Sequence, residues 1–199
     1  KSAPLKSALP KSAWRKSAIA NLDRPSQWAI LQKRTAHRDK PEDLSATMRF
    51  LWDDQYLYMG LEVRDDVFCQ PECNGAIWRG DGLQFLVDPC RSSSDKPGKY
   101  DYTVALGTKG AQAWCYCTAD PAAAPVDEVK DFLIRITPTG KRGDMVYEVA
   151  MPWKRLSPFK PVPGANLGFA MIVNDDDGRI RDSFIAWFGC AHSKQMSMN

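Results

Sequence analysis

The chain of 199 residues is 44% hydrophobic and 26% charged, enough for one globular core without requiring a second domain. Its net charge of +3 is unevenly placed, because residues 1–20 hold five basic residues and no acid; subtracting those five charges leaves −2 for the rest. A slightly acidic globular part argues against a nucleic-acid partner. No run approaches the roughly 18 apolar residues of a membrane span, so no such span is expected.

Residues 1–20 are expected to form a basic, extended arm, and residues 21–199 a single domain. The arm repeats Lys-Ser-Ala four times and offers little apolar surface for burial. The chain begins without an initiator Met or an apolar leader, which we interpret as a processed protein or a fragment of a longer one.

From Ala46 onward, apolar and polar side chains alternate with the two-residue period of extended strands. Two alternating runs flank the acidic turn 53–55 and predict a hairpin. Further strands are expected over residues 78–88, 100–106, 111–117, 132–136, 145–151, 167–173 and 181–188, with one helical turn at 153–156. Many short strands without helical periodicity predict an all-β fold, an antiparallel β-sandwich.

Six cysteines are an even number, which permits up to three disulfides and hence an exported protein. Free, buried cysteines are the alternative. Cys115 and Cys117 lie two apart on a predicted strand and are not expected to bridge to each other. A zinc site is disfavoured because the cysteine spacings match no zinc knuckle and no histidine lies at ligand spacing from a cysteine pair.

The sequence resembles the family 9 carbohydrate-binding modules in six blocks, which cover most of the chain from about residue 22 to 187. In order, these blocks are FLWDDQYLY (50–58), EVRDD (62–66), WRGDGLQFLVD (78–88), YEVAMPW (147–153), LGF (167–169) and NDDDG (174–178). The resemblance implies a β-sandwich related to DOMON domains. It also implies an extracellular, periplasmic or cell-surface module, attached to a glycoside hydrolase and without catalytic activity of its own.

The best-studied members of that family hold the end of a sugar chain between two Trp rings. By resemblance, Trp78 matches one ring, Gln84 stands where the family has an acid that hydrogen-bonds the sugar, and Asn174 lies in the matching strand. Arg79 and Trp114 complete the set of candidate ligand-binding residues. An aromatic face suits this function because it covers the apolar face of a pyranose and excludes water. The expected ligand is a polysaccharide or oligosaccharide.

Several positions depart from the family pattern. Thr103 and Ala105 stand where the family has an Arg and an Asn, Ile172 replaces a Gln, and no Trp after Trp187 supplies the second ring. These departures motivate an alternative function: a structural or assembly domain with a degenerate sugar site, whose basic arm docks on a neighbouring subunit.

The block at 174–178 concentrates hard oxygen ligands of the kind that calcium uses. Asp175 and Asp177, together with Asp81, are the candidate ligands of a structural calcium ion, which the family resemblance also implies. Asp65 and Asp66 are acids that could converge on the same place. A water-solvated acidic turn is the alternative.

The chain contains neither a Gly-x-Ser-x-Gly nor a His-Glu-x-x-His motif, so no enzyme is expected. Asp81 and Glu148 could in principle flank a glycosidic bond, but Glu148 belongs to a strand pattern that the family keeps without using it for chemistry. No organic cofactor is expected. A haem, as in some DOMON relatives, is a weaker alternative, and the sequence has no Cys-x-x-Cys-His motif.

Overall fold

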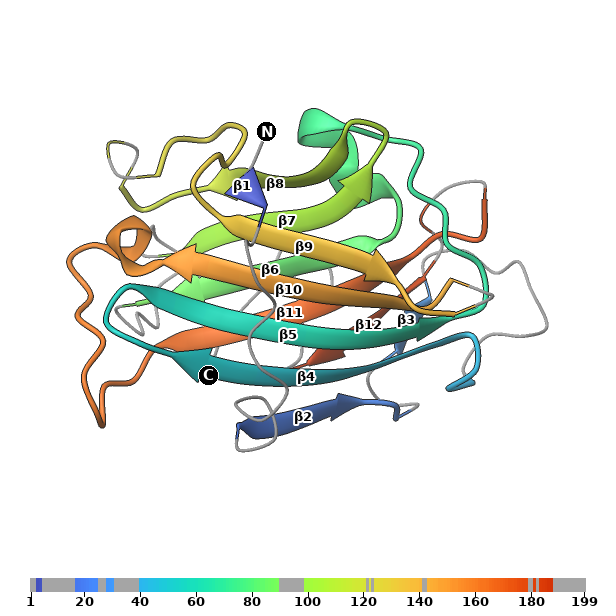
Figure 1. Cartoon of the computed structure of the whole chain (residues 1–199), viewed down its shortest axis with the longest axis horizontal. Coiled ribbons are helices and arrows are strands. Elements are labelled where there is room, and N and C mark those ends of the chain that lie inside the picture. Colours follow the sequence, from blue (N-terminus) through green and yellow to red (C-terminus); the bar gives the residue numbers. More distant parts are fainter. Residues whose placement is uncertain are drawn as a thin grey trace.

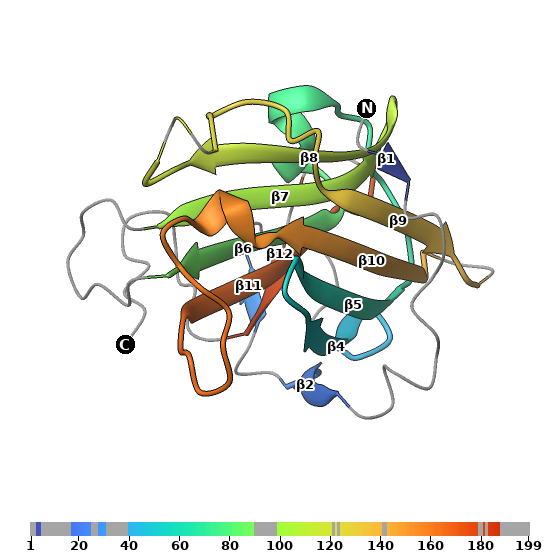
Figure 2. The same cartoon turned by 60° about the vertical axis from the view of Figure 1, so that its left-hand side comes forward.

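A computed structural model describes residues 3–4, 17–24, 28–30, 40–89, 99–120, 122, 124–140, 143–178, 181 and 183–187. Its strands form two six-stranded sheets that pack face to face (Figures 1 and 2). The predicted β-sandwich is therefore confirmed. Every strand pair is antiparallel except the short parallel pair of β1 and β9.

The two sheets, called sheet A and sheet B, each combine early and late parts of the chain. Sheet A contains, in spatial order, β1 (Ala3–Pro4), β9 (Leu133–Pro138), β10 (Met145–Pro152), β5 (Tyr56–Asp65), β4 (Leu44–Trp52) and β2 (Ala18–Leu22). Sheet B contains β3 (Trp28–Ile30), β12 (Ser183–Trp187), β11 (Gly168–Asp175), β6 (Gly82–Asp88), β7 (Tyr100–Gly107) and β8 (Gly110–Cys117).

The core lies between the sheets, where the alternating apolar side chains meet. Phe85 stands at its centre, with ring centroids 5.5 Å from Tyr102, 5.9 Å from Phe169 and 6.4 Å from Phe132. Because side chains alternate along a strand, burying one parity of β6 and β7 directs the other parity to the outer face of sheet B. That outer face carries the candidate ligand residues.

The predicted arm contributes strands to sheet A. Its described parts are β1 and the first residues of β2; these strands pair with β9 and β4 and so lie at opposite edges of the sheet. Both described parts therefore pair with this chain's own domain. Trp14 and the histidines lie outside the described residues.

Two short 3-10 helices accompany the strands in the described part of the chain. The predicted turn at 153–156 is confirmed as η3 (Trp153–Leu156). The helix η2 (Asn74–Arg79) occupies residues predicted as loop and strand, and β6 begins only at Gly82. Asn74 starts η2 with a φ of 56°, a left-handed conformation that Asn tolerates better than most residues. Trp78 and Arg79 therefore project from a helical turn.

The strand registers define two ends of the sandwich. At the first end, β4 begins opposite the last residue of β5 (Leu44 against Asp65), and β6 begins opposite the end of β11 (Gly82 against Asn174). At the second end, Trp52 faces Leu57 across the β4–β5 hairpin. Trp52 is 49% exposed, because it ends β4 beside the turn.

The cysteines described by the structure, Cys69, Cys73, Cys115 and Cys117, are all free thiols. Cys115 Sγ lies 3.3 Å from the Cys117 backbone oxygen, consistent with the expectation that these two do not bridge. Cys90 and Cys190 lie outside the described residues. None of the helices in the described part is long and apolar enough to cross a membrane.

Candidate functional site

A row of side chains crosses the outer face of sheet B on four neighbouring strands. The registers place Ile172 beside Gln84, Gln84 beside Thr103, and Thr103 beside Trp114. Two candidate ligand residues, Gln84 and Trp114, therefore share one cross-strand row. Thr103 and Ile172, two of the positions that depart from the family pattern, fill the rest of the row and are buried.

Trp78 lies at the end of η2, which contacts β6, β7 and β8. Trp78 is 36% exposed, and two guanidinium groups lie against its indole ring. The guanidinium carbon of Arg181 is 5.1 Å from the ring centroid, and that of Arg79 is 5.5 Å away. The ring is thus partly open to solvent and flanked by positive charge, an arrangement that favours cation–π contact.

Asn174 is completely buried, and both ends of its amide are engaged. Its Nδ2 lies 3.4 Å from the Trp78 carbonyl oxygen, and its Oδ1 accepts a hydrogen bond of 3.0 Å from Arg181. The prediction that Asn174 contacts the ligand therefore becomes a prediction that it positions Trp78 and Arg181. The sequence alone did not point to Arg181, because no motif surrounds it.

Gln84 is half-buried and is held by Asp101 of β7. Its Nε2 donates to both carboxylate oxygens of Asp101, at 3.1 and 3.2 Å. Burial raises the pKa of Asp101 to about 6, although the hydrogen bond from Gln84 opposes the shift. Within the described chain no donor is found for Gln84 Oε1, which leaves this oxygen able to accept from a sugar hydroxyl.

An Asp101→Asn substitution is expected to raise the melting temperature at pH 7, since an amide can still accept from Gln84 without a buried charge. The folded-state pKa of about 6 exceeds the unfolded value of about 3.9. The contribution of Asp101 to stability is therefore greatest below pH 4 and declines as the pH rises to about 6. Between pH 4 and 8 the melting temperature of the variant should fall less than that of the parent protein. Superimposable plots of melting temperature against pH would contradict the raised pKa of Asp101.

Trp114 supports η2 from below. A Cβ atom placed on Gly75 would lie 3.2 Å from the Trp114 indole, so the helix backbone packs directly on this ring. Buried Gln70 fixes the other end of the loop, because its Nε2 donates to the backbone oxygens of Ile77 (2.9 Å) and Asp81 (2.7 Å). Trp114 and Gln70 thus set the position of Trp78.

Acidic side chains gather at the first end of the sandwich, in two groups. In the first group, oxygens of Asp65, Asp81 and Asp175 lie within 4.8 Å of one another, and all three residues are buried. Burial raises the pKa of Asp65 to about 8, and the carboxylates of Asp175, Asp66 and Asp177 act in the same direction. Burial also raises the pKa of Asp81 well above its ordinary value. Such repulsion favours a bound cation.

The second group consists of Asp43, Asp66 and Asp177, again within 4.8 Å. Asp66 Oδ1 is buried and has no hydrogen-bond partner among the residues that the structure describes. The predicted ligands Asp81, Asp175 and Asp177 are therefore divided between two adjacent groups, and Asp65 and Asp66 join them. Buried carboxylate oxygens converging in threes fit calcium, which takes six to eight oxygen ligands. When bound, the ion would offset the negative charge of aspartates that come from both sheets and would so hold the two sheets together.

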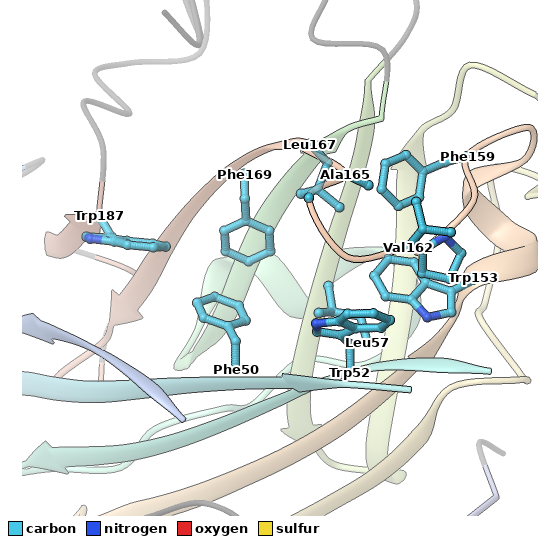
Figure 3. A pocket seen from close by; sticks show the side chains of 12 residues that line it. Phe50, Trp52, Leu57, Trp153, Phe159, Val162, Ala165, Leu167, Phe169 and Trp187 are labelled. Atoms are coloured by element: carbon cyan, nitrogen blue, oxygen red, sulfur yellow. The ribbon is translucent and has the colours of Figure 1, made fainter. Parts of the chain in front are cut away.

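A cavity of about 300 Å³ opens at the second end of the sandwich. Figure 3 shows its aromatic walls, with Phe50, Phe169 and Trp187 on one side and Trp153 and Phe159 on the other. The Trp153 Nε1 already donates to the Asp53 carbonyl oxygen, at 2.8 Å. This lining offers few polar groups that would orient a sugar, unlike the surroundings of Trp78.

The acids suggested for glycoside cleavage do not converge. Glu148 pairs with Gly60 in sheet A and has the parity of the outer face, where its carboxylate lies 3.9 Å from Arg135. Asp81 precedes β6 in the other sheet and is buried, accepting hydrogen bonds from the backbone N–H groups of Cys69 and Asp176. A pair of acids that flank a bond must face a shared cleft, and these two do not.

A fold by itself does not define a function, and what distinguishes this two-sheet β-sandwich is an exposed aromatic side chain beside polar groups on one outer face. Residues 20–195 match the family described as carbohydrate family 9 binding domain-like, and the chain belongs to that family. Endo-1,4-beta-xylanases A from Thermotoga maritima and Thermotoga neapolitana are each 28% identical over 160 residues, 79% of this chain. The chain spans only 14% of either xylanase.

Solved structures show the same fold. A family 9 module from Caldicellulosiruptor kristjanssonii in complex with glucose has a TM-score of 0.60 at 18% identity, with 93% of this chain and 83% of that chain covered. A family 9 module from the same organism in complex with cellotriose has a TM-score of 0.55 at 20% identity, with 87% of this chain and 74% of that chain covered. A putative carbohydrate-binding protein from Bacteroides uniformis has a TM-score of 0.53 at 12% identity, with 87% of this chain and 78% of that chain covered.

Proposed function

We propose that this domain is a non-catalytic module that binds an oligosaccharide or polysaccharide on the outer face of sheet B, at Trp78. The observation that carries the proposal is the partly exposed indole, set beside polar and charged side chains. Stacking of a pyranose on the ring would bury apolar surface of both partners. Gln84 Oε1 would accept a hydroxyl hydrogen bond and fix the sugar's orientation.

The relatives support an exported role. Because the xylanases that resemble this chain are far longer, we infer that the domain accompanies a glycoside hydrolase and keeps it near polysaccharide at the cell surface or outside the cell. The two clusters of three aspartates at the first end would hold calcium and stabilise the sandwich beneath Trp78.

Isothermal titration calorimetry against neutral and acidic oligosaccharides tests the binding proposal. We expect heat of binding for at least one ligand, with a dissociation constant in the micromolar to millimolar range. A chain that binds none of them, while its melting curve shows a folded domain, would refute a sugar-binding function.

A second candidate is a structural or assembly domain. It is favoured by the buried Thr103 and Ala105, and by the two guanidinium groups that partly cover Trp78. The described parts of the arm pair with sheet A, so deleting the arm would remove strands as well as charge. Light scattering on the intact chain is the suitable test: an oligomer without sugar affinity would support assembly, and a monomer would reject it.

A further inference from the structure

Two arginines contact Trp78 at the proposed sugar site. The Arg181 guanidinium lies 5.1 Å from the Trp78 ring centroid and 5.8 Å from that of Phe184, while Arg79 approaches Trp78 at 5.5 Å. The Arg181 backbone N–H donates to the Arg79 carbonyl oxygen at 2.9 Å, which links the two segments. Both positive charges are therefore attached to the structure that presents the indole.

The positive charge of this pair is weakly compensated within the described chain. Arg181 is half-buried, and its side-chain hydrogen bond goes to the neutral amide of Asn174, with no carboxylate of the described residues within ion-pair distance. Burial alone accounts for the lowered pKa of Arg181, which remains fully charged at neutral pH. Arg79 approaches Glu72 at 3.9 Å, but both side chains are substantially exposed, so the pair is weak.

We propose that the saccharide bound at Trp78 is acidic, with a uronic acid whose carboxylate pairs with Arg181 and Arg79. This inference rests on the proposed sugar-binding function and specifies its substrate class. A carboxylate is planar and accepts two parallel N–H hydrogen bonds from one guanidinium, a stronger arrangement than hydrogen bonds to neutral hydroxyls. Asn174 would hold Arg181 in place while the pyranose ring stacks on the indole.

Matched ligands separate this inference from the general function. Cellotriose and β-1,4-linked triglucuronate differ only at C6, and trigalacturonate can be compared with its methyl ester in the same way. Calorimetry at 25 and 250 mM NaCl should show the acid of at least one pair binding about tenfold tighter than its neutral partner. The difference should shrink at high salt, where charge interactions at an accessible site are screened.

Charge-removing variants locate the preference. Arg79→Gln is expected to reduce affinity for the acidic ligand severalfold and affinity for its neutral partner by less, so that the ratio of the two affinities falls. Arg181→Gln should have a larger effect on the same ratio. Arg135→Gln is the matched control, because Arg135 is similarly exposed and also lies 3.9 Å from its acid, but on sheet A. Because the Arg181 guanidinium packs on two rings, a melting curve must show that Arg181→Gln is folded. If Arg181→Gln unfolds, Arg79→Gln alone provides the test.

Each outcome decides a different point. Equal affinity for acid and neutral partners would overturn the acidic-ligand inference and leave the sugar-binding function standing. A preference for acids that survives Arg79→Gln, or falls equally with Arg135→Gln, would also overturn it. Absence of binding to every ligand would refute both proposals together.

Discussion

Trp78→Ala is expected to lower oligosaccharide affinity by about 30- to 1,000-fold, because truncating a central aromatic contact costs about 2–4 kcal/mol in comparable sites. Trp78 is more exposed than Trp114, the other candidate tryptophan of the site, and no other ring in the described chain contacts both arginines. Its loss would also remove the surface on which Arg181 and Arg79 rest. Calorimetry on parent and variant measures the effect directly.

Trp52→Ala is the matched control for this experiment. Trp52 is also an exposed tryptophan, at 49%, but it borders the cavity at the second end of the sandwich. It should leave sugar affinity within about twofold, since it is remote from sheet B's outer face. If Trp52→Ala abolished binding and Trp78→Ala did not, the site would have to be moved to the aromatic cavity shown in Figure 3.

Removal of calcium is expected to lower the melting temperature by roughly 10 to 20 °C. Each ion bound at a hundredfold excess over its dissociation constant stabilises the folded state by about 2.7 kcal/mol. For a domain of this size each kcal/mol corresponds to about 2–4 °C. Two ions, one in each cluster of three aspartates, therefore give a fall of roughly 10 to 20 °C in the melting temperature. Melting curves with calcium and with a chelator measure it, and magnesium should replace calcium poorly because it demands a tighter, octahedral shell.

Single substitutions distinguish the two proposed metal sites. Asp65→Asn should remove the first site and Asp66→Asn the second, so that each reduces the calorimetric calcium stoichiometry from two to one. Asp54→Asn, in the exposed turn between β4 and β5, should leave it unchanged. Without metal, the raised pKa of Asp65 should make stability fall as the pH rises from about 4 to about 8. Retention of the full melting temperature in chelator would contradict a structural calcium.

The strands could be predicted from sequence because their alternation is strong. β5 buries Leu57, Met59, Leu61 and Val63, whereas Glu62 and Arg64 remain exposed, as the two-residue period requires. η2 could not be predicted, because its conformation depends on the left-handed Asn74 and on packing against Trp114 from β8. Local sequence does not reveal a partner that lies about 40 residues further along the chain.

The candidate site was only partly predictable for the same reason. Trp78 and Gln84 stand within one sequence block, and the resemblance to family 9 modules pointed to both. Arg181 reaches Trp78 only because β11 and β12 return the chain to the first end of the sandwich. Likewise, Asp65 and Asp81 converge from opposite sheets, a proximity that arises only when the two layers pack.

The position of β1 and β2 at opposite edges of sheet A has a consequence for handling the protein. Proteolytic trimming of the first 24 residues would uncover the hydrogen-bonding rims of β9 and β4 at once. Unprotected rims of this kind recruit strands from other molecules and lead to aggregation. A preparation that loses its N-terminus during storage should therefore precipitate or form fibres, even though the residues that surround Trp78 are still present.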